Sequence, residues 1–484
     1  MSTDRLDPTR RSFLANTAFG VGAVALAHLL HEEELLANPA NVTPENHPLS
    51  LAPRSPHFAP RANAMISLFM HGGPSHVDLF DPKPELTRKH GTDYEGEVGF
   101  SFVNRASKKL FSTPWRFRKH GESGAEISEL LPEIATCADD LCIVRSMHTG
   151  HNGHEVSIRF FHNGIPAQTG RPTLGSWLVY GLGSQSRELP AYMVLSDPGG
   201  PPVDGPVNWS SGFMAPLYQG TVLRPNEPRI LNLDAPAKLK GAAQQRNLDF
   251  LDRLNRAHLE RHPGEADLES RIQSFELAAK MQTAAKEALD VSREPRYIQE
   301  MYGLDDDATR EYGTRCLIAR RLVERGVRFV QLFLGGQPWD HHQGIKANLP
   351  TICRRTDKPS AALVKDLKQR GLLETTLVHW GGEIGRLPVV EGELNDAAGR
   401  DHNGQGFTIW MAGGGIKPGI TFGATDEVGH KAVEDVVTPN DFQATVLNLF
   451  GLDHTRLAYQ AGGRTQRLID GREARVVKEI LESS

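Results

Sequence analysis

Carboxylates occur in five short segments of this 484-residue chain, and four of these segments also contain histidines. The segments are HGGPSHVDLFD (71–81), HTGHNGHEVSIRFFHNG (148–164), GGQPWDHH (335–342), GGEIGR (381–386) and GRDHNGQG (399–406). Imidazole nitrogens and carboxylate oxygens are donors for divalent metals such as Zn²⁺, Mn²⁺ or Ca²⁺. A donor set without thiolates favours a hydrolytic metal site over an electron-transfer site. For any single histidine, the alternative is a side chain that braces a loop through hydrogen bonds.

Most of these segments adjoin an apolar run of the length of a buried strand. The runs cover residues 64–70, 141–144, 191–195, 327–334, 375–380 and 407–412. Helical patterns near 308–325 and 359–370 precede two of them. Strands that alternate with helices predict an α/β fold with a mostly parallel sheet covered on both faces. Ligands of such sheets bind beyond the carboxyl ends of the strands, which is where these segments are expected to lie.

An insertion is predicted at about 243–300, where the chain is rich in charged residues and its apolar residues recur at helical spacing. Leu248 and Leu251 belong to one helical pattern, and Ile272 and Phe275 belong to a second. The spacing predicts two amphipathic helices. Our interpretation is that these helices face the core and have no role in chemistry.

Composition excludes several classes of protein. Lysine and arginine total 54 against 59 acidic residues, a net charge of -5, and no basic block is present, so no nucleic-acid partner is expected. The four cysteines, Cys137, Cys142, Cys316 and Cys353, lack CxxC spacing, which argues against a zinc-thiolate site. We expect them to be buried as small apolar residues, although one or two disulfides remain open.

The N-terminus has the features of an export signal. Arg10 and Arg11 precede a mostly apolar run at 15–30, and the pattern resembles a twin-arginine signal. The run is shorter than the ~20 residues of a membrane span, so no stable span beyond the signal is expected. The predicted organisation is given by four segments: a signal at 1–37, a linker at 38–62, one large domain at 63–470 and a C-terminal tail at 471–484. A periplasmic or cell-envelope protein is therefore expected.

The five segments, together with SELLP, GRPTLGSWLVYGLG and GATDEVG, carry a resemblance to a known family. As a set they resemble a bacterial family of exported proteins of unknown function that is placed in the alkaline phosphatase/sulfatase superfamily. The resemblance covers nearly the whole chain after the signal. It implies a three-layer α/β/α, alkaline-phosphatase-like fold with a metal site at the carboxyl edge of the sheet.

The resemblance also implies which residues hold a divalent metal. Asp340, a following histidine and His402 correspond to the ligands of one metal, and we favour His342 over His341. Asp78 and Glu383 would serve a second metal. The superfamily usually has an Asp-His pair at the second of these positions, and Ile384 stands where that histidine would be.

The nucleophile is implied less clearly. Superfamily members attack with Ser, Thr or formylglycine, and Thr149 stands in the expected segment, with a bound water as the alternative. Ser112 begins a short S-T-P-W-R match to the sulfatase pattern without its continuation. Arg386 or one of His148, His151 and His154 would offset charge on the ester oxygens. For Arg386 the alternative is a salt bridge to Glu383.

Two functions follow as expectations. The first is an exported metal-dependent hydrolase of sulfate or phosphate esters, acting on a small molecule or a polysaccharide. The second is a non-catalytic metal-binding or glycan-binding envelope protein on a degenerate sulfatase fold. The missing sulfatase motif and the departure at Ile384 motivate the second.

Overall fold

The computed structural model describes residues 50–101, 106–233, 241–262 and 266–483. The predicted signal at 1–37 lies outside the described residues. Residues 51–484 form one compact unit. Among the described residues, no helix combines the length and the apolar character that a membrane span requires.

An eight-stranded sheet with the order β12-β4-β11-β8-β1-β7-β5-β6 forms the centre of this unit. Its strands are β1 (Ala64–Phe69), β4 (Cys142–Met147), β5 (Tyr192–Leu195), β6 (Thr221–Leu223), β7 (Phe329–Phe333), β8 (Thr376–Gly381), β11 (Phe407–Ala412) and β12 (Ile420–Phe422). Neighbouring strands are parallel except that β11 runs antiparallel to both β4 and β8. Every residue of β1, β7 and β8 is buried, as expected of strands covered on both faces.

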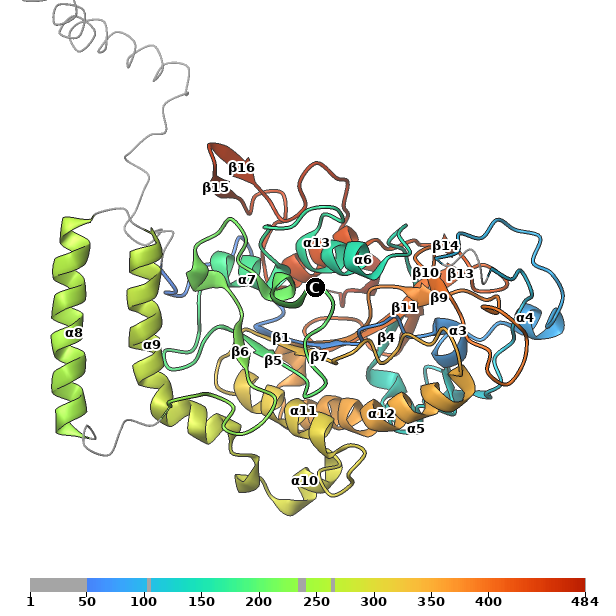
Figure 1. Ribbon diagram of the computed structural model, residues 1–484, viewed down its shortest axis with the longest axis horizontal. Coiled ribbons are helices and arrows are strands. Elements are labelled where there is room, and N and C mark those ends of the chain that lie inside the picture. The colour runs from blue at the N-terminus through green and yellow to red at the C-terminus, as the bar shows by residue number, and fades with distance from the viewer. Residues whose placement is uncertain (1–49, 102–105, 234–240, 263–265, 484) are drawn as a thin grey trace, which may run out of the picture. The chain divides into compact units, whose positions relative to one another are not determined.

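Helices cover both faces of the sheet (Figure 1). On one face lie α6 (His154–Asn163), α7 (Leu174–Leu182) and α13 (Pro439–Leu449). On the other lie α5 (Pro132–Ala135), α11 (Arg310–Val323) and α12 (Ile345–Gln369). The expected three-layer α/β/α architecture with a mostly parallel sheet is therefore confirmed.

Helix α12 begins well before the predicted start near 359. Proline usually marks a helix boundary, because it lacks the backbone donor of an interior position. Two prolines, Pro350 and Pro359, lie inside the helix. The helix continues through both because its apolar face, which includes Leu349, Ile352 and Leu363, is buried in the core. Tertiary packing has outweighed the local penalty of proline.

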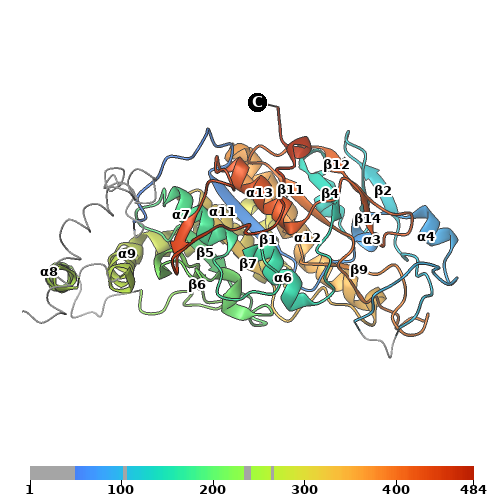
Figure 2. The ribbon, with the colours of Figure 1, turned by 90° about the horizontal axis from the view of Figure 1, so that it is seen from above.

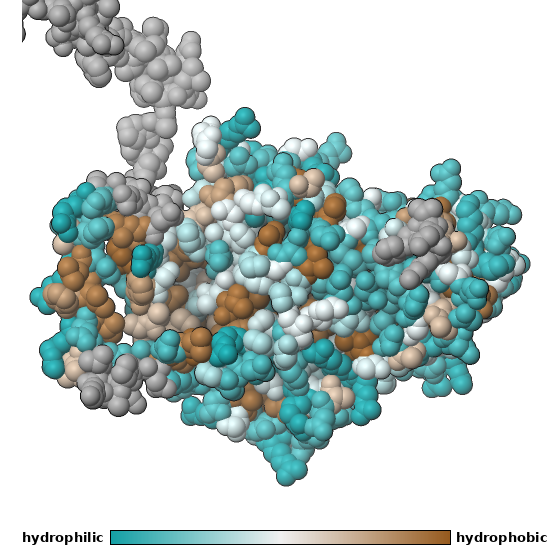
Figure 3. Space-filling model, viewed as in Figure 1, coloured by the Kyte–Doolittle hydropathy of each residue, from teal (hydrophilic) through white to brown (hydrophobic). Residues whose placement is uncertain are grey.

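The two helices predicted in the insertion are present as α8 (Ala242–Arg261) and α9 (Ala266–Leu289). In the view from above, α9 lies beside α7 and β6, and α8 lies on the outer side of α9 (Figure 2). Only α9 reaches the core, through residues such as Ala285 and Ala288. Helix α8 buries no residue and leaves Phe250 and Leu251 about half exposed. The hydropathy surface shows this apolar area (Figure 3). The expectation that both helices face the core is therefore wrong for α8.

The remaining elements are short. They are α3 (His76–Leu79), α4 (Pro84–Arg88), α10 (Arg296–Met301), β2 (Phe117–His120), β3 (Ala125–Ser128), β9 (Gly385–Arg386), β10 (His402–Asn403), β13 (Ala424–Thr425), β14 (Ala432–Glu434), β15 (Tyr459–Ala461) and β16 (Arg464–Gln466). All four cysteines are buried and free, as expected. The predicted C-terminal tail is packed on the domain, since Val477 and Ile480 are buried and Leu481 bridges to Ile416.

Candidate metal centre

The sheet order brings the histidine-rich segments to one edge. Strands β8, β1 and β7 are adjacent and parallel, so the loops that follow Gly381, Phe69 and Phe333 leave the sheet side by side. The loop after β4 leads from the same edge into α6, which begins at His154. His402 precedes β11 rather than following it, but β11 is antiparallel, so its amino end lies at this edge.

Three histidines surround the carboxylate of Asp340. Nε2 of His342 and Nε2 of His402 lie 3.0 Å and 3.2 Å from Asp340 Oδ1. Nε2 of His154 lies 3.4 Å from Asp340 Oδ2. The Nε2 atoms of His342 and His402 are 3.0 Å apart. We call these four residues the Asp340 cluster.

The donors of the Asp340 cluster fit a metal ion. Zinc lies about 2.0–2.1 Å from nitrogen or oxygen ligands in a tetrahedral site, which places the ligand atoms roughly 3.4 Å apart. The distances of 3.0–3.4 Å between these donors approach that value. His154, Asp340 and His402 can each offer one donor atom within 4.8 Å of the others. Nε2 of His154 is buried and lies 3.4 Å from Asp340 Oδ2, as expected of a ligand atom that would share a cation with this carboxylate.

Each histidine of the cluster has a second partner on its other ring nitrogen. Nδ1 of His154 lies 2.6 Å from Glu383 Oε1, and Nδ1 of His402 lies 3.1 Å from Ser101 Oγ. Nδ1 of His342 hydrogen-bonds Glu391 Oε2. Metal-binding histidines are usually oriented in this way, because the second partner fixes both the tautomer and the ring plane.

A backbone donor holds Glu383 in turn. The Gly72 amide donates to both oxygens of this carboxylate, at 3.0 Å and 3.3 Å. Gly72 has a φ of +110°, and a Cβ there would lie 2.9 Å from the Asp340 backbone nitrogen. A glycine is therefore required where β1 ends, because the loop passes so close to the Asp340 segment.

The residues of the Asp340 cluster have pKa values that are shifted in different directions. Burial raises the pKa of Asp340, but hydrogen bonds from the three histidines and the charge of Arg386 outweigh it and lower that pKa well below its usual range. Burial lowers the pKa of His154, but hydrogen bonds to Asp340 and Glu383 outweigh it and raise that pKa to about 9. Burial lowers the pKa of His402 to about 4. Without an ion, Asp340 is thus ionised, His402 is neutral and His154 is protonated. A metal that binds here would displace the proton of His154, because a ligating imidazole is neutral.

Of the predicted metal ligands, Asp340, His342 and His402 are brought together, whereas Asp78 and Glu383 are placed differently. Asp78 lies in α3, where both oxygens accept from the Arg400 guanidinium at 2.8 Å and 3.2 Å. Neither residue of this ion pair is exposed. Glu383 contacts His154 rather than offering a free carboxylate, so its observed position is that of an orienting residue.

Some of the predicted catalytic residues lie in the Asp340 cluster and others lie outside it. His154 belongs to the Asp340 cluster. The Thr149 hydroxyl is 3.1 Å and 3.3 Å from the carbonyl oxygens of His151 and Gly404, to which it donates. The His151 ring packs edge-on against Phe160 of α6, with centroids 6.3 Å apart. The structure therefore does not bring Thr149 into the cluster. Ser112 is also elsewhere, with its amide bonded to His90.

Arg386 is buried beneath the centre. Its guanidinium donates to Asp340 Oδ1 at 2.5 Å, to the carbonyl oxygens of Gly73 and Arg400 at 3.0 Å and 3.2 Å, and to the carbonyl of Gly72. The predicted alternative, a salt bridge to Glu383, is not formed. A fully buried guanidinium with these partners fixes Asp340 in place.

Three residues of the site were not predicted. Glu391, Ser101 and Arg400 lie outside the histidine-rich strand ends or were not distinguished within them. An acidic residue, a serine and an arginine are common in loops, so nothing in the sequence sets these three apart. Only the fold brings Glu391 to His342 and Ser101 to His402.

Comparison with known proteins shows the family. A family described as a protein of unknown function (DUF1501) matches residues 62–481, and the chain belongs to it. No curated protein matches the sequence.

The chain is also similar to solved structures at low identity. PsFucS1 sulfatase from Pseudoalteromonas sp. has 13% identity and a TM-score of 0.35, over 82% of this chain and 68% of that one. Phosphonate monoester hydrolase SpPMH from Silicibacter pomeroyi has 12% identity and a TM-score of 0.32, over 73% and 72%. Alkaline phosphatase from the Antarctic bacterium TAB5 has 10% identity and a TM-score of 0.31, over 82% and 99%. At these scores the architecture rests on the sheet order and the layers described above.

Proposed function

We propose that this protein is a metal-dependent hydrolase of sulfate or phosphate esters. One observation carries the proposal: three histidines, each held through Nδ1 by a separate partner, direct Nε2 toward the single carboxylate of Asp340. Ordering and burying three polar rings in this way costs free energy, which the binding of a metal ion would offset. We place the chain in the alkaline phosphatase/sulfatase superfamily on the motifs that Asp340, His342 and His402 represent.

The residues of the chain would position a divalent metal and the ester. His154, His342, His402 and Asp340 would hold the ion, which when bound supplies Lewis-acid stabilisation of an ester oxygen and acidifies water. Glu383 and Glu391 keep two of the rings in the ligating tautomer. Arg386 keeps Asp340 ionised and in position.

We assign the attack to water rather than to Thr149. The Thr149 hydroxyl already donates to backbone carbonyls, at 3.1 Å and 3.3 Å. A hydroxyl that attacks phosphorus or sulfur needs a base or a cation beside it. The contacts of the Thr149 hydroxyl are the carbonyls of His151 and Gly404 and the His151 amide, none of which is a base or a cation.

Export is part of the proposal. Arg10, Arg11 and the apolar run at 15–30 support passage by the twin-arginine route to the periplasm or cell envelope. A protein exported in the folded state could carry its metal with it, which agrees with an Asp340 cluster built from three separate segments.

Metal analysis and ester hydrolysis test the proposal together. The full chain, purified without chelators, should contain about one equivalent of Zn, Mn or Ca, because the donors of the Asp340 cluster surround one position. It should hydrolyse 4-nitrophenyl phosphate or 4-nitrophenyl sulfate. Asp340→Asn should lose both the metal and the turnover, while Asp396→Asn, which alters an exposed carboxylate paired with Lys346, should lose neither. Wild-type protein free of metal would contradict the ligand assignment.

A non-catalytic metal-binding protein is the second candidate. The burial of Arg386 favours it, because this guanidinium is not free to stabilise a substrate oxyanion. This candidate predicts metal at the Asp340 cluster with no turnover of either aryl ester.

A further inference from the structure

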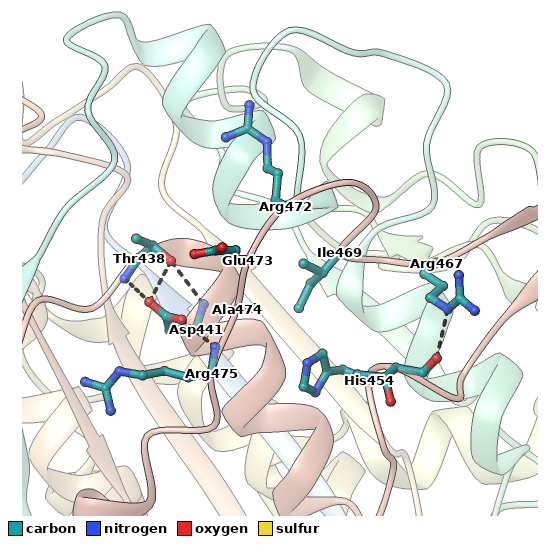
Figure 4. Close-up of a pocket in the computed structure, with 10 residues that line it drawn as sticks. Thr438, Asp441, His454, Arg467, Ile469, Arg472, Glu473, Ala474 and Arg475 are labelled. Atoms are coloured by element: carbon teal, nitrogen blue, oxygen red, sulfur yellow. Dashed lines mark hydrogen bonds between the residues drawn. The ribbon is translucent and has the colours of Figure 1, made fainter.

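The pocket at the start of α13 uses its polar groups for local structure. Its volume is about 810 Å³, and three arginines contribute to its wall (Figure 4). The arginine side chains point apart, and Arg475 is paired with Glu479 at 3.2 Å. The Thr438 hydroxyl is bonded to Asp441 in the capping box of α13. These contacts do not converge on a ligand.

Helix α8, in contrast, exposes large apolar side chains. The exposed fractions of Phe250, Leu251 and Leu254 are 56%, 51% and 48%. Single exposed apolar residues are ordinary on a protein surface, but these three lie together on one helix. At about 100° per residue, they fall within an arc of about 100° around the helix axis. We call this apolar patch the α8 face.

Helix α9 covers a different strip of α8. The Gln244 side chain of α8 donates a hydrogen bond to Gln282 of α9, and Leu248 and Leu259 are half-buried. Gln244, Leu248 and Leu259 share an arc of about 60°, next to the α8 face rather than within it. Since α8 lies on the outer side of α9, the α8 face is exposed at the edge of the domain (Figure 2).

The charges of α8 are divided between its two sides. Arg261 lies within the arc of the α8 face, and Arg246 lies at its border, about 40° from Phe250. Both arginines are exposed. The acidic residues of the helix lie on the opposite side, where Arg256 pairs with one of them at 2.8 Å: they are Asp249, Asp252 and Glu260. The α8 face thus combines apolar side chains with positive charge.

This charge pattern disfavours a second copy of the chain as the occupant. Two α8 helices packed face to face in antiparallel orientation would bring Arg246 of one copy near Arg261 of the other. In parallel orientation, each arginine would approach its own equivalent. Like charges brought together at an interface oppose association. An occupant that is apolar and carries negative charge beside the apolar part matches the face better.

We propose that the α8 face docks the protein on an anionic phospholipid surface, with α8 lying along the membrane plane. Amphipathic helices bind in this way when apolar side chains enter the boundary between headgroups and acyl chains. Basic side chains at the same depth attract anionic headgroups. The inference goes beyond the proposed hydrolase function and does not depend on a metal at the Asp340 cluster. It agrees with the proposed location in the periplasm or cell envelope.

Binding to phospholipid vesicles tests the proposal. Co-sedimentation with vesicles of equal parts phosphatidylglycerol and phosphatidylcholine would compare the full-length wild type with two double variants. Phe250→Ser/Leu254→Ser should bind at least about tenfold more weakly, because it removes the apolar area that the lipid would bury. Arg246→Gln/Arg261→Gln should bind at least about fivefold more weakly, because each arginine near an anionic surface strengthens binding. On phosphatidylcholine alone, this arginine variant should bind as the wild type does.

Matched controls change the same residue types outside the α8 face. Tyr297→Ser/Val433→Ser removes two apolar side chains that are 67% and 61% exposed on α10 and β14. Arg256→Gln/Arg296→Gln removes two exposed arginines, one of them on the opposite side of α8. Both control variants should bind the anionic vesicles as the wild type does.

Hydrogen exchange gives a readout that is local to α8. The apolar run at 15–30 is common to all variants, so any binding through it adds equally to each. Amides of residues 242–261 should exchange more slowly when vesicles are added to the wild type, because docking opposes local opening of the helix. This protection should be lost in Phe250→Ser/Leu254→Ser.

Each remaining outcome has a definite meaning. Unchanged exchange at 242–261, or equal vesicle binding by the wild type and Phe250→Ser/Leu254→Ser, overturns the proposal. Equal losses in the control variants overturn the α8 face as the site, and equal binding to phosphatidylcholine alone overturns the requirement for anionic headgroups. A dimer in analytical ultracentrifugation that Phe250→Ser/Leu254→Ser dissociates, without vesicle binding, identifies a second copy as the occupant. Vesicle binding through the α8 face in a protein without metal or turnover overturns the hydrolase function and retains the docking surface.

Discussion

Glu391 accepts a hydrogen bond from Nδ1 of His342, on the side of the ring opposite Asp340. Because Glu391 is buried, its carboxylate holds the His342 imidazole in one orientation. The same arrangement recurs with Glu383 and His154. Carboxylates in this position raise the basicity of a ligating imidazole as well as orienting it.

Replacement of Glu391 should weaken metal binding without removing a ligand. We expect Glu391→Gln to lower the metal affinity by about 10–100-fold, the usual effect of losing an orienting partner. Competition with a chromophoric chelator measures the affinity. Glu393→Gln is the matched control, because Glu393 is exposed two residues further along the same loop. Equal affinities for the two variants would exclude an orienting role for Glu391.

Metal should stabilise the folded protein through the Asp340 cluster. A ligand that binds only the native state adds about 2.7 kcal/mol at a concentration one hundred times its Kd. Chelator-treated wild type should therefore show a higher Tm in differential scanning calorimetry when Zn²⁺ is restored. Asp340→Asn should show no such increase. An equal increase in both proteins would place the stabilising metal at another site.

Thr149 should prove structural. Thr149→Val removes the donor to the carbonyls of His151 and Gly404 and should cost about 1–3 kcal/mol of unfolding free energy, as for a buried polar group that loses its partner. Its kcat/KM on aryl esters should stay within about threefold of the wild type, since a spectator hydroxyl removes no transition-state stabilisation. Urea denaturation and steady-state kinetics measure the two quantities. A loss of activity by several orders of magnitude in soluble, folded Thr149→Val would identify Thr149 as the nucleophile.

The ion pair of Asp78 and Arg400 should contribute to stability rather than to metal binding. Both side chains are fully buried, so Asp78→Asn leaves an unpaired buried guanidinium. Loss of one member of such a pair costs about 3–5 kcal/mol. Urea denaturation should show this loss, whereas Asp396→Asn at the surface should change stability by less than about 1 kcal/mol. Metal content of the folded Asp78→Asn protein should equal that of the wild type, and a loss of metal would return Asp78 to the ligand set.

The sequence by itself predicted the architecture and part of the centre. Apolar runs of strand length marked the six longer strands of the sheet to within a few residues, because buried parallel strands are apolar on both faces. Asp340 and His342 lie beyond the carboxyl end of an apolar run, where ligands of such sheets bind, and His402 lies before another run. The resemblance to the family then selected these three as metal ligands. His154 was also identified, although as a catalytic residue.

Only the tertiary structure decided which of these side chains meet. Asp78 and Arg400 are 322 positions apart, and their pairing removes Asp78 from the predicted ligand set. Glu391 reaches His342 across 49 positions, and Ser101 reaches His402 across 301. A strand-end pattern fixes the edge at which a side chain lies, since it depends on local hydrophobicity alone. The partner of each side chain depends on strand order and loop paths, which are set by packing over the whole domain.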